Sequence, residues 1–329
     1  MNFADQLIES IMAQKSYLCV GLDPQLKYIP KHIRKDAAWK CGAGLDAAVQ
    51  AILVYFRTIV DVTAPYAACY KPQVAFYEKF CSEGFAVLEA IKDYIECLGF
   101  PVILDAKRED GGDTAQAYAD TYLGSMEVLD EEGEIVEIPS LLGFSAITVT
   151  PWIDTPNFAP FLRACKKNGR GIFVVDKTSF KPPSRLQEAV IEGSGGKKAW
   201  MELAEFAKEM GEDIKGDSGY SSIGVVMGAT YPQEAEVMKK IYPDCFKLVP
   251  GFKAQGGTAD EAVVSVNEDG FGFVANSSRG TNYAYHEVSK SNHQCDPRFF
   301  AKAIADETRE ERDALNTSVK KRIGKLPWE

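Results

Sequence analysis

Short apolar runs recur eight times along the chain, and longer segments with helical periodicity separate them. Strands that are apolar along their whole length, rather than alternating with polar residues, are typical of a parallel sheet that helices cover on both faces. Eight such units within 329 residues predict a (β/α)8 barrel, with 1–329 forming a single domain. The alternative is a doubly wound open sheet, but no GxGxxG fingerprint follows the first run. The runs lie at 17–23, 67–73, 101–107, 146–150, 171–177, 222–228, 245–250 and 272–278.

Four segments stand outside this alternation of strand and helix. Residues 1–15 carry apolar side chains at helical spacing and predict an amphipathic helix. Residues 28–44 separate the first strand from its helix. Residues 126–140 alternate apolar and polar side chains around "EEGE", which predicts a surface hairpin inserted in the barrel. Residues 179–196 form a long loop after the fifth strand, and long loops are often functional.

The composition excludes several classes of protein. The net charge of −10 argues against a general nucleic-acid partner and against a basic membrane-binding face. No apolar run approaches the roughly 18 residues that a membrane span needs, and the amino terminus does not have the pattern of a signal peptide. None of the eight cysteines forms a CxxC pair, and there is no HExxH motif or Cys/His cluster. We therefore expect a cytoplasmic protein with reduced thiols and no metal site.

Charged residues stand where the first three predicted strands end. In a (β/α)8 barrel the active site lies at these carboxyl ends. Asp23 follows the first strand, Lys71 ends the second, and Asp105 and Lys107 end the third. A lone aspartate here is more often a helix cap, and a lone lysine more often lies on the surface. Because the four residues converge on one mouth of the barrel, we expect a site that holds opposite charges close together.

The segment "LDAKREDGGDT", residues 104–114, carries the densest part of this pattern. Asp105 and Lys107 are two residues apart on a strand and therefore share a face. A lysine beside carboxylates keeps its proton, which suits a proton donor or an electrostatic clamp better than a Schiff-base amine. Asp110 and Thr114 are four residues apart and would share a helix face if a helix begins at Asp110. The alternative, equally supported, is that Asp110 only caps that helix.

Two glycine-rich segments follow the seventh and eighth strands. "PGFKAQGG", residues 250–257, contains Gln255 and Gly256, and "NSSRG", residues 276–280, contains Arg279. Loops at these two positions often bind phosphate in such barrels through backbone N–H groups, an amide and a guanidinium. The alternative is a plain glycine-rich turn with Arg279 on the surface.

These segments occur together with "GLDP" and "KPQVAFYE" in one order and spacing. Over nearly its whole length the chain resembles the longer-chain branch of the orotidine 5'-phosphate decarboxylase family. The most specific element of the resemblance is the D-x-K-x-x-D-x-x-x-T pattern, which begins at Asp105.

The resemblance implies a carboxy-lyase of de novo pyrimidine biosynthesis that converts orotidine 5'-phosphate to uridine 5'-phosphate and carbon dioxide without a metal or organic cofactor. It also implies a homodimer of barrels. Lys107 would protonate the C6 carbon, Asp105 would face the departing carboxylate, and Lys71 would hold Asp105 and a ribose hydroxyl. The other implied site residues are Asp23 at the ribose, Asp110 and Thr114 in the site of the neighbouring subunit, Thr150 and Pro250 at the pyrimidine, and Gln255, Gly256 and Arg279 at the phosphate.

Three positions depart from the family pattern. Gly111 stands where a large aliphatic residue is usual, Thr150 where asparagine is frequent, and "VVDKTS", residues 174–179, replaces an Arg-Thr-Ser form. Two other functions are compatible with the motifs. One is a magnesium-dependent keto-sugar-phosphate decarboxylase of the same superfamily, and the other is a catalytically silent barrel that binds phosphate.

Overall fold

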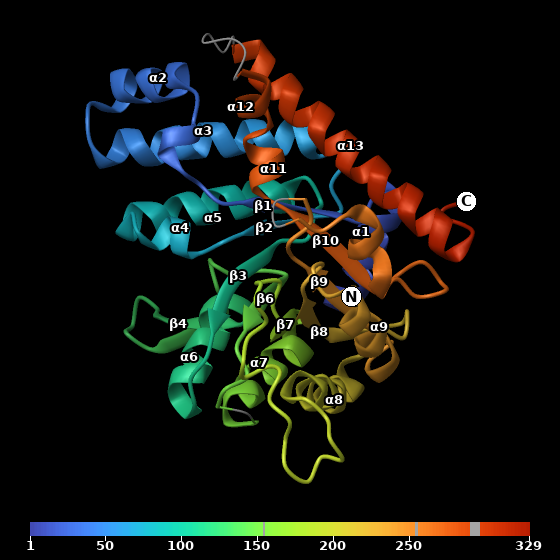
Figure 1. The fold of residues 1–329 in the computed structure, drawn as a ribbon. Helices are drawn as coiled ribbons and strands as arrows, with labels where there is room; N and C mark the ends of the chain where they lie inside the picture. The colour runs from blue at the N-terminus through green and yellow to red at the C-terminus, as the bar shows by residue number, and fades with distance from the viewer. Residues whose placement is uncertain (154, 254–255, 290–296) are drawn as a thin grey trace.

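The computed structural model of the chain describes residues 1–153, 155–253, 256–289 and 297–329. Its eight-stranded parallel sheet runs in the order β2-β1-β10-β9-β8-β7-β6-β3. The two end strands meet through parallel bridges that join Tyr70 to Val102 and Gln73 to Asp105, so the sheet closes on itself. The predicted (β/α)8 barrel is confirmed (Figure 1). The strands are β1 Leu18–Leu22, β2 Cys69–Pro72, β3 Ile103–Arg108, β6 Ala146–Val149, β7 Gly171–Lys177, β8 Ser221–Met227, β9 Cys245–Val249 and β10 Phe273–Ser277.

Helices surround the barrel because each places an apolar stripe against it. In α3, for example, Tyr55, Phe56, Ile59 and Val60 are buried at helical spacing. The helices that follow α1 are α2 Lys31–Cys41, α3 Leu45–Thr63, α4 Ala75–Glu78, α5 Cys81–Cys97, α6 Gly112–Leu123, α7 Thr155–Asn168, α8 Ala199–Gly211, α9 Pro232–Ile241, α10 Ala259–Ala262, α11 Arg279–Asn282, α12 Ala284–Ser289 and α13 Pro297–Ile323, with short 3-10 turns at Leu26–Tyr28, Glu212–Ile214 and Val263–Ser265.

Helix α1, Phe3–Gln14, covers the amino-terminal end of the barrel. The Asn2 side chain caps it by accepting a hydrogen bond from the N–H of Asp5 at 2.9 Å. The ring of Phe3 meets Phe173 of β7 edge to face, with 5.7 Å between the ring centroids. The carboxyl ends of the strands lie at the opposite end of the barrel.

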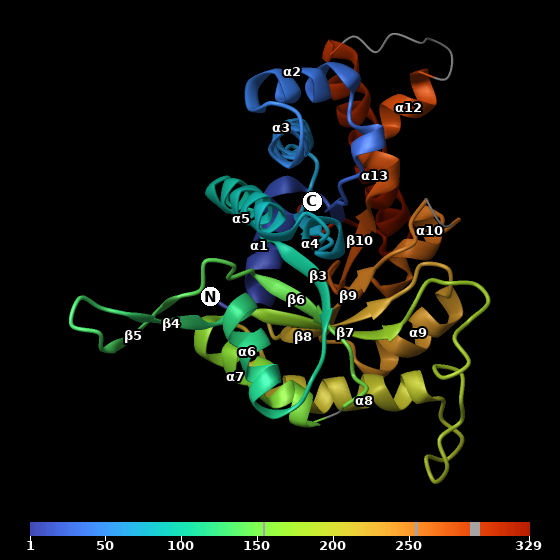
Figure 2. The ribbon, with the colours of Figure 1, turned by 90° about the vertical axis from the view of Figure 1, so that its left-hand side faces the viewer.

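Two of the additions to the barrel have regular structure of their own. Residues 28–44 contain α2, which lies along α3. Strands β4, Ser125–Leu129, and β5, Ile135–Pro139, pair antiparallel and form a hairpin that projects away from the barrel (Figure 2).

The long helix α13 returns along the outside of the barrel (Figure 1). It packs against α3, α10 and α11, and buries Ile304, Leu315 and Val319. This path brings its middle turns next to the loops that follow β9 and β10. Those loops are the predicted phosphate side of the site.

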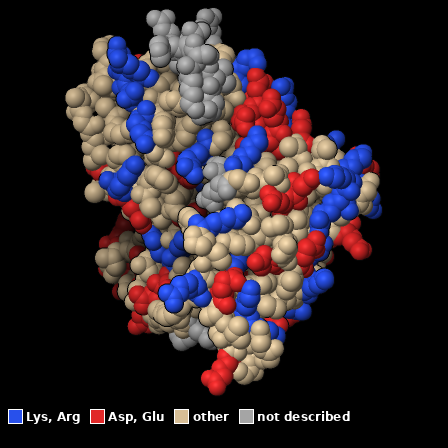
Figure 3. All heavy atoms as spheres, viewed as in Figure 1, with Lys and Arg blue, Asp and Glu red and all other residues tan. Residues whose placement is uncertain are grey.

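The charged surface and the cysteines are as expected from the amino-acid composition. Acidic and basic side chains are interspersed over the face shown in Figure 3. The seven cysteines that the structure describes are all free. Among the described residues, no helix combines the length and the apolar character needed to cross a membrane.

Candidate active site

Two lysines and an aspartate form an ionic array at the carboxyl ends of β2 and β3. The Nζ atom of Lys71 lies 2.8 Å from Oδ2 of Asp105, and the Nζ atom of Lys107 donates to Oδ1 of the same carboxylate. The exposed fractions of the Lys71, Asp105 and Lys107 side chains are 5%, 15% and 45%. Lys71 is therefore the buried member of the array, and Lys107 is its most exposed member.

The ion pair between Lys71 and Asp105 shifts the pKa values of both residues. Burial alone would raise the pKa of the Asp105 carboxyl, but the adjacent ammonium groups of Lys71 and Lys107 hold that pKa well below its usual range. Burial would lower the pKa of the Lys71 ammonium, but the negative charges of Asp105 and Asp23 raise it above its ordinary value. Asp105 and Lys71 therefore hold each other in the charged form.

The backbone at Lys107 is unusual. Its φ angle is +49°, in the left-handed region that non-glycine residues seldom occupy, and the pairing of β3 with β6 shifts register between Leu104 and Arg108. Strain of this kind costs on the order of 1–3 kcal/mol and tends to occur at functional sites. Here it turns the end of β3 so that the Lys107 side chain folds back onto Asp105.

Thr148 of β6 holds this turn in place. Its Oγ1 atom accepts hydrogen bonds from the N–H groups of Ala106 and Lys107, at 3.0 and 2.9 Å. It also lies 3.1 Å from Oδ1 of Asp105, to which it donates. Thr148 is buried and was not among the sequence-predicted site residues. It lies two residues before the predicted Thr150, which is just beyond the end of β6.

Asp23 joins the array from β1. Burial raises the pKa of the Asp23 carboxyl above its ordinary value, and the nearby Lys71 charge opposes that rise. The carboxylate lies against Ser278, because the chain of β1 passes very close to that residue at Gly21. A Cβ atom at position 21 would lie 1.8 Å from the Ser278 hydroxyl oxygen, so only glycine fits there.

A cavity of about 450 Å³ opens above these residues. Asp23, Lys71 and Asp105 line it, as do the predicted residues Pro250 and Arg279, whereas Lys107 does not. The volume is within the range of small-molecule sites. The remaining lining residues were not predicted as site residues and are Gln25, Gln73, Phe76, Phe180, Gly251, Phe252, Asn276 and Ser278.

The predicted phosphate loops border this cavity on one side. Arg279 is exposed and begins α11, and Gly256 closes a turn by donating its N–H to the Lys253 carbonyl at 2.9 Å. Gly256 does not itself line the cavity. Gln255 lies outside the described residues.

The buried carboxylate of Glu311, on α13, contacts both phosphate loops. It accepts hydrogen bonds from Ser277 at 2.8 Å and from Thr281 at 2.7 Å. The Nζ atom of Lys253 lies 3.8 Å from Oε1 of Glu311 and 2.5 Å from Oε1 of Glu307. Burial raises the pKa of Glu311 to about 7, although the Thr281 hydroxyl and the Lys253 charge favour the ionised form.

This raised pKa predicts a pH-dependent stability. Between the ordinary pKa of 4.5 and about 7 the folded chain binds a proton at Glu311 that the unfolded chain has lost. The free energy of unfolding therefore falls as pH rises through this range. Glu311→Gln has no carboxyl to titrate and should not lose this stability. Its free energy of unfolding, relative to that of the unsubstituted protein, should therefore increase by about 2–3 kcal/mol from pH 5 to pH 8. Urea unfolding at both pH values measures this gain, and Glu310→Gln, at an exposed position of the same helix, should show none.

Asp110 and Thr114 occupy a different place from the array. Helix α6 begins at Gly112 with Gly111 as its N-cap, so Asp110 precedes the helix and does not provide a side-chain cap. Its Oδ1 atom accepts from the N–H of Gly111 at 2.7 Å, and its own N–H donates to Asn157. Thr114 is exposed in the first turn of α6. Neither residue lines the cavity of its own chain.

Thr150 lies just beyond β6 and does not line the cavity either. Its N–H donates to the Arg108 carbonyl at 3.0 Å, and its carbonyl accepts from the Asn157 side chain at 2.8 Å. These bonds tie the end of β6 to the end of β3 and to α7.

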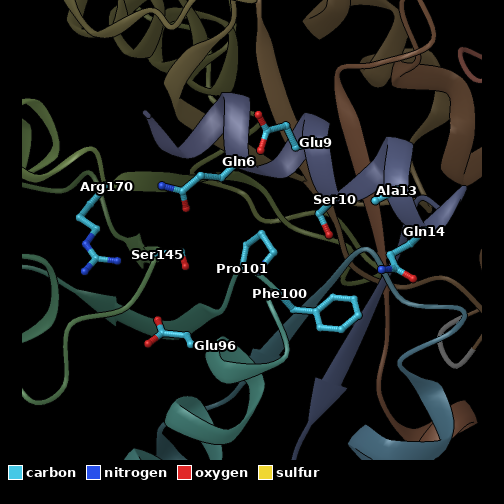
Figure 4. Close-up of a pocket in the computed structure, with 11 residues that line it drawn as sticks. Gln6, Glu9, Ser10, Ala13, Gln14, Glu96, Phe100, Pro101, Ser145 and Arg170 are labelled. Carbon is cyan, nitrogen blue, oxygen red and sulfur yellow. The ribbon is translucent and has the colours of Figure 1, made fainter.

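A second cavity, of about 480 Å³, lies at the amino ends of the strands beneath α1. The side chains of Glu9 from α1, Glu96 from α5 and Arg170 surround it (Figure 4). Among the described residues, none of the charged array lines this cavity. Its volume is slightly larger, but no described residue of the predicted site lines it.

Comparison with known proteins agrees with this geometry. Residues 16–280 match the model of the orotidine 5'-phosphate decarboxylase / HUMPS family. The chain belongs to this family. It is 36% identical to an orotidine 5'-phosphate decarboxylase of Rhodopirellula baltica, with 87% of this chain and 89% of the relative covered. It is 35% identical to that of Haloarcula marismortui, with 96% and 99% covered. The solved structure of Leishmania donovani OMP decarboxylase superposes on this chain with a TM-score of 0.66 at 30% identity. The match covers 95% of this chain and 100% of that structure.

The structure bears on two of the three departures from the pattern of the orotidine 5'-phosphate decarboxylase / HUMPS family, and explains one of them. Gly111 has an ordinary φ of −114°, and a Cβ atom there would lie 3.8 Å from Ile153, so the backbone does not require glycine at this position. Lys177, in "VVDKTS", is buried and ion-paired with Glu188. Glu188 also accepts from Lys198 at 2.7 Å and so anchors the long loop after β7, which places Phe180 at the cavity.

Proposed function

We propose that this chain decarboxylates orotidine 5'-phosphate to uridine 5'-phosphate and carbon dioxide in pyrimidine biosynthesis, as a carboxy-lyase without a cofactor. The single observation that carries the proposal is the Lys71–Asp105–Lys107 array, in which Lys107 is ion-paired with Asp105, and Lys71 and Asp105 line the cavity. Family membership, and relatives at 31–36% identity that bear the decarboxylase name, support it independently.

The array fits the chemistry of this reaction. When the bond between C6 and the carboxylate breaks, the electron pair remains on C6, next to no carbonyl that could accept it. The Lys107 ammonium stabilises the developing negative charge and then donates its proton to C6, after which water reprotonates the amine. Lys71 holds Asp105, and Asp105 in turn orients Lys107. Asp105 also faces the place of the departing carboxylate.

Binding at the far end of the substrate would support this step. Arg279, Gln255 and Gly256 would hold the phosphate, Asp23 the ribose, and Pro250 and Thr150 the pyrimidine. Interactions remote from the reacting carbon orient it against Lys107 and lower the barrier in that way. The 450 Å³ cavity that joins Asp23, Asp105, Pro250 and Arg279 supports the assignment of these residues, whereas Thr150 and Gly256 do not line it.

We further propose a homodimer in the cytoplasm, with Asp110 and Thr114 completing the site of the neighbouring subunit. The position of Asp110 before α6 and the exposure of Thr114 support a role outside their own barrel. The free thiols of the described cysteines are those expected in a reducing compartment.

The proposed reaction has a direct test. Purified protein mixed with orotidine 5'-phosphate should remove the orotate absorbance, and an excess of EDTA should leave the rate unchanged. A protein that leaves the absorbance constant is not this decarboxylase. A rate that EDTA abolishes and magnesium restores would instead favour the keto-sugar-phosphate type of mechanism.

The structure gives one reason to expect insensitivity to EDTA. A magnesium ion needs several oxygen ligands. Both oxygens of Asp105 already accept hydrogen bonds from ammonium groups. To serve as a magnesium ligand, Asp105 would have to give up its hydrogen bond to at least one of the two lysines. The positive charges of both lysines would then lie close to the charge of the metal ion.

A further inference from the structure

Glu311 is the point at which α13 meets both loops of the predicted phosphate side. It is fully buried, and its carboxylate is bound by Ser277 and Thr281. These two residues lie two positions before and two positions after Arg279. The carboxylate therefore holds both ends of the short turn from which the Arg279 guanidinium projects.

The turn is pressed closely onto this carboxylate. A Cβ atom at Gly280 would lie 3.0 Å from Oε1 of Glu311 and 3.3 Å from the Ser277 hydroxyl oxygen. The Thr281 hydroxyl also lies 3.0 Å from that of Ser277, so the three polar side chains form one connected cluster. Because α11 is only four residues long, its own hydrogen bonds cannot fix the direction of Arg279.

The second loop reaches the same helix through Lys253. Its backbone has a φ of +53°, and it forms a tight turn in which its N–H donates to the Gly257 carbonyl at 2.7 Å. Its ammonium group lies between Glu307 and Glu311, one helical turn apart on α13. The loops after β9 and β10 are thus tied to one rigid element and, through it, to each other.

We propose that Glu311 is a positioning residue for the phosphate group of the substrate, because it fixes the loop of Lys253 and the turn of Arg279 relative to one another. This inference rests on the proposed function, since phosphate is the group that the two loops are assigned to bind.

Charge alone would give Glu311 the opposite effect. A carboxylate behind a phosphate site repels the phosphate and weakens binding. Lys253 offsets part of that repulsion, and the hydroxyl bonds to Ser277 and Thr281 use both carboxylate oxygens. If geometry governs, removing the carboxylate weakens phosphate binding. If charge governs, removing it strengthens binding.

Calorimetric titration with uridine 5'-phosphate and with uridine tests this inference. For Glu311→Ala we expect the affinity for the nucleotide to fall about tenfold or more, with the affinity for the nucleoside within twofold of the unsubstituted protein. The KM for orotidine 5'-phosphate should rise. Glu311→Gln, whose amide still accepts a hydroxyl bond, should recover most of the nucleotide affinity. Glu310→Ala, at an exposed position of the same helix, is the matched control and should change neither affinity.

Two results would overturn the inference: an unchanged or tighter nucleotide affinity in Glu311→Ala, or an equal loss for nucleotide and nucleoside. If Glu311→Ala does not fold, Thr281→Val, which removes one hydroxyl bond at constant shape, should show a smaller loss confined to the nucleotide, and an unchanged affinity there counts against the inference.

The proposed function can fail separately from this inference. A protein that binds the nucleotide through Glu311 but does not decarboxylate orotidine 5'-phosphate would refute the proposed reaction alone. A decarboxylase whose Glu311→Ala variant keeps its KM and its nucleotide affinity would refute the positioning role alone.

Discussion

Lys107→Ala should lower kcat for orotidine 5'-phosphate by at least about 10⁴-fold, because one substitution removes the group that we propose as both the proton donor and the cation that stabilises the carbanion. The exposed position of Lys107 at the mouth of the array makes it the group that can reach the substrate. Removing it should cost little folding free energy, since Asp105 keeps its buried partner Lys71. Stopped-flow or steady-state absorbance at the orotate band gives kcat directly.

Binding measurements separate loss of chemistry from loss of the site. The Lys107→Ala protein should still bind uridine 5'-phosphate, with an affinity changed far less than kcat, because the product has no charge developing at C6. Lys167→Ala is a matched control, since Lys167 is an exposed lysine that pairs with Glu137 of the hairpin. Turnover that persists in Lys107→Ala within tenfold of the unsubstituted rate would rule out Lys107 as the proton donor.

The fold and the core of the site could be predicted from the sequence, because both follow from the pattern of apolar and charged residues along the chain. Continuous apolar strands spaced by helices determine a closed parallel barrel, and such a barrel brings its strand ends together. Lys71, Asp105 and Lys107 end their strands, so their convergence could be predicted without knowing any distance. Asp23 lies close to them for the same reason.

Other parts of the site depend on details that no local pattern encodes. The positive φ of Lys107 and the role of Thr148 arise from a register shift between two strands that are far apart in sequence. A threonine within an apolar strand gives no signal that it will accept two backbone N–H groups. Its placement two residues before Thr150 was the one available indication.

The exact start of a helix and the way a helix packs on the barrel could not be predicted from the sequence either. The spacing of Asp110 and Thr114 implied a shared face only if the helix began at Asp110, and α6 begins two residues later. The link from Glu311 to Ser277 spans 34 residues and depends on how α13 packs on the barrel. Such long-range contacts follow from tertiary packing, which periodicity does not describe.

Asp105→Asn should destabilise the fold as well as abolish activity. The Lys71 side chain is only 5% exposed, and Asp105 provides the nearest negative charge to it. An asparagine of equal size leaves a buried ammonium without its ion-pair partner, and breaking a buried pair in this way costs about 3–5 kcal/mol. Urea unfolding at pH 7 measures the loss. Asp113→Asn, an exposed aspartate in the first turn of α6, should change the free energy of unfolding by less than about 0.5 kcal/mol.

A double substitution distinguishes the cost of the unpaired charge from the cost of lost packing. In Lys71→Met with Asp105→Asn both charges are gone, and much of the stability should return, because replacing a buried ion pair with neutral side chains is often close to neutral. Activity should not return, since Asp105 no longer orients Lys107. If the double variant is as unstable as the sum of the single variants, the two residues do not act as a pair. In that case the array does not organise the site in the way that its geometry implies.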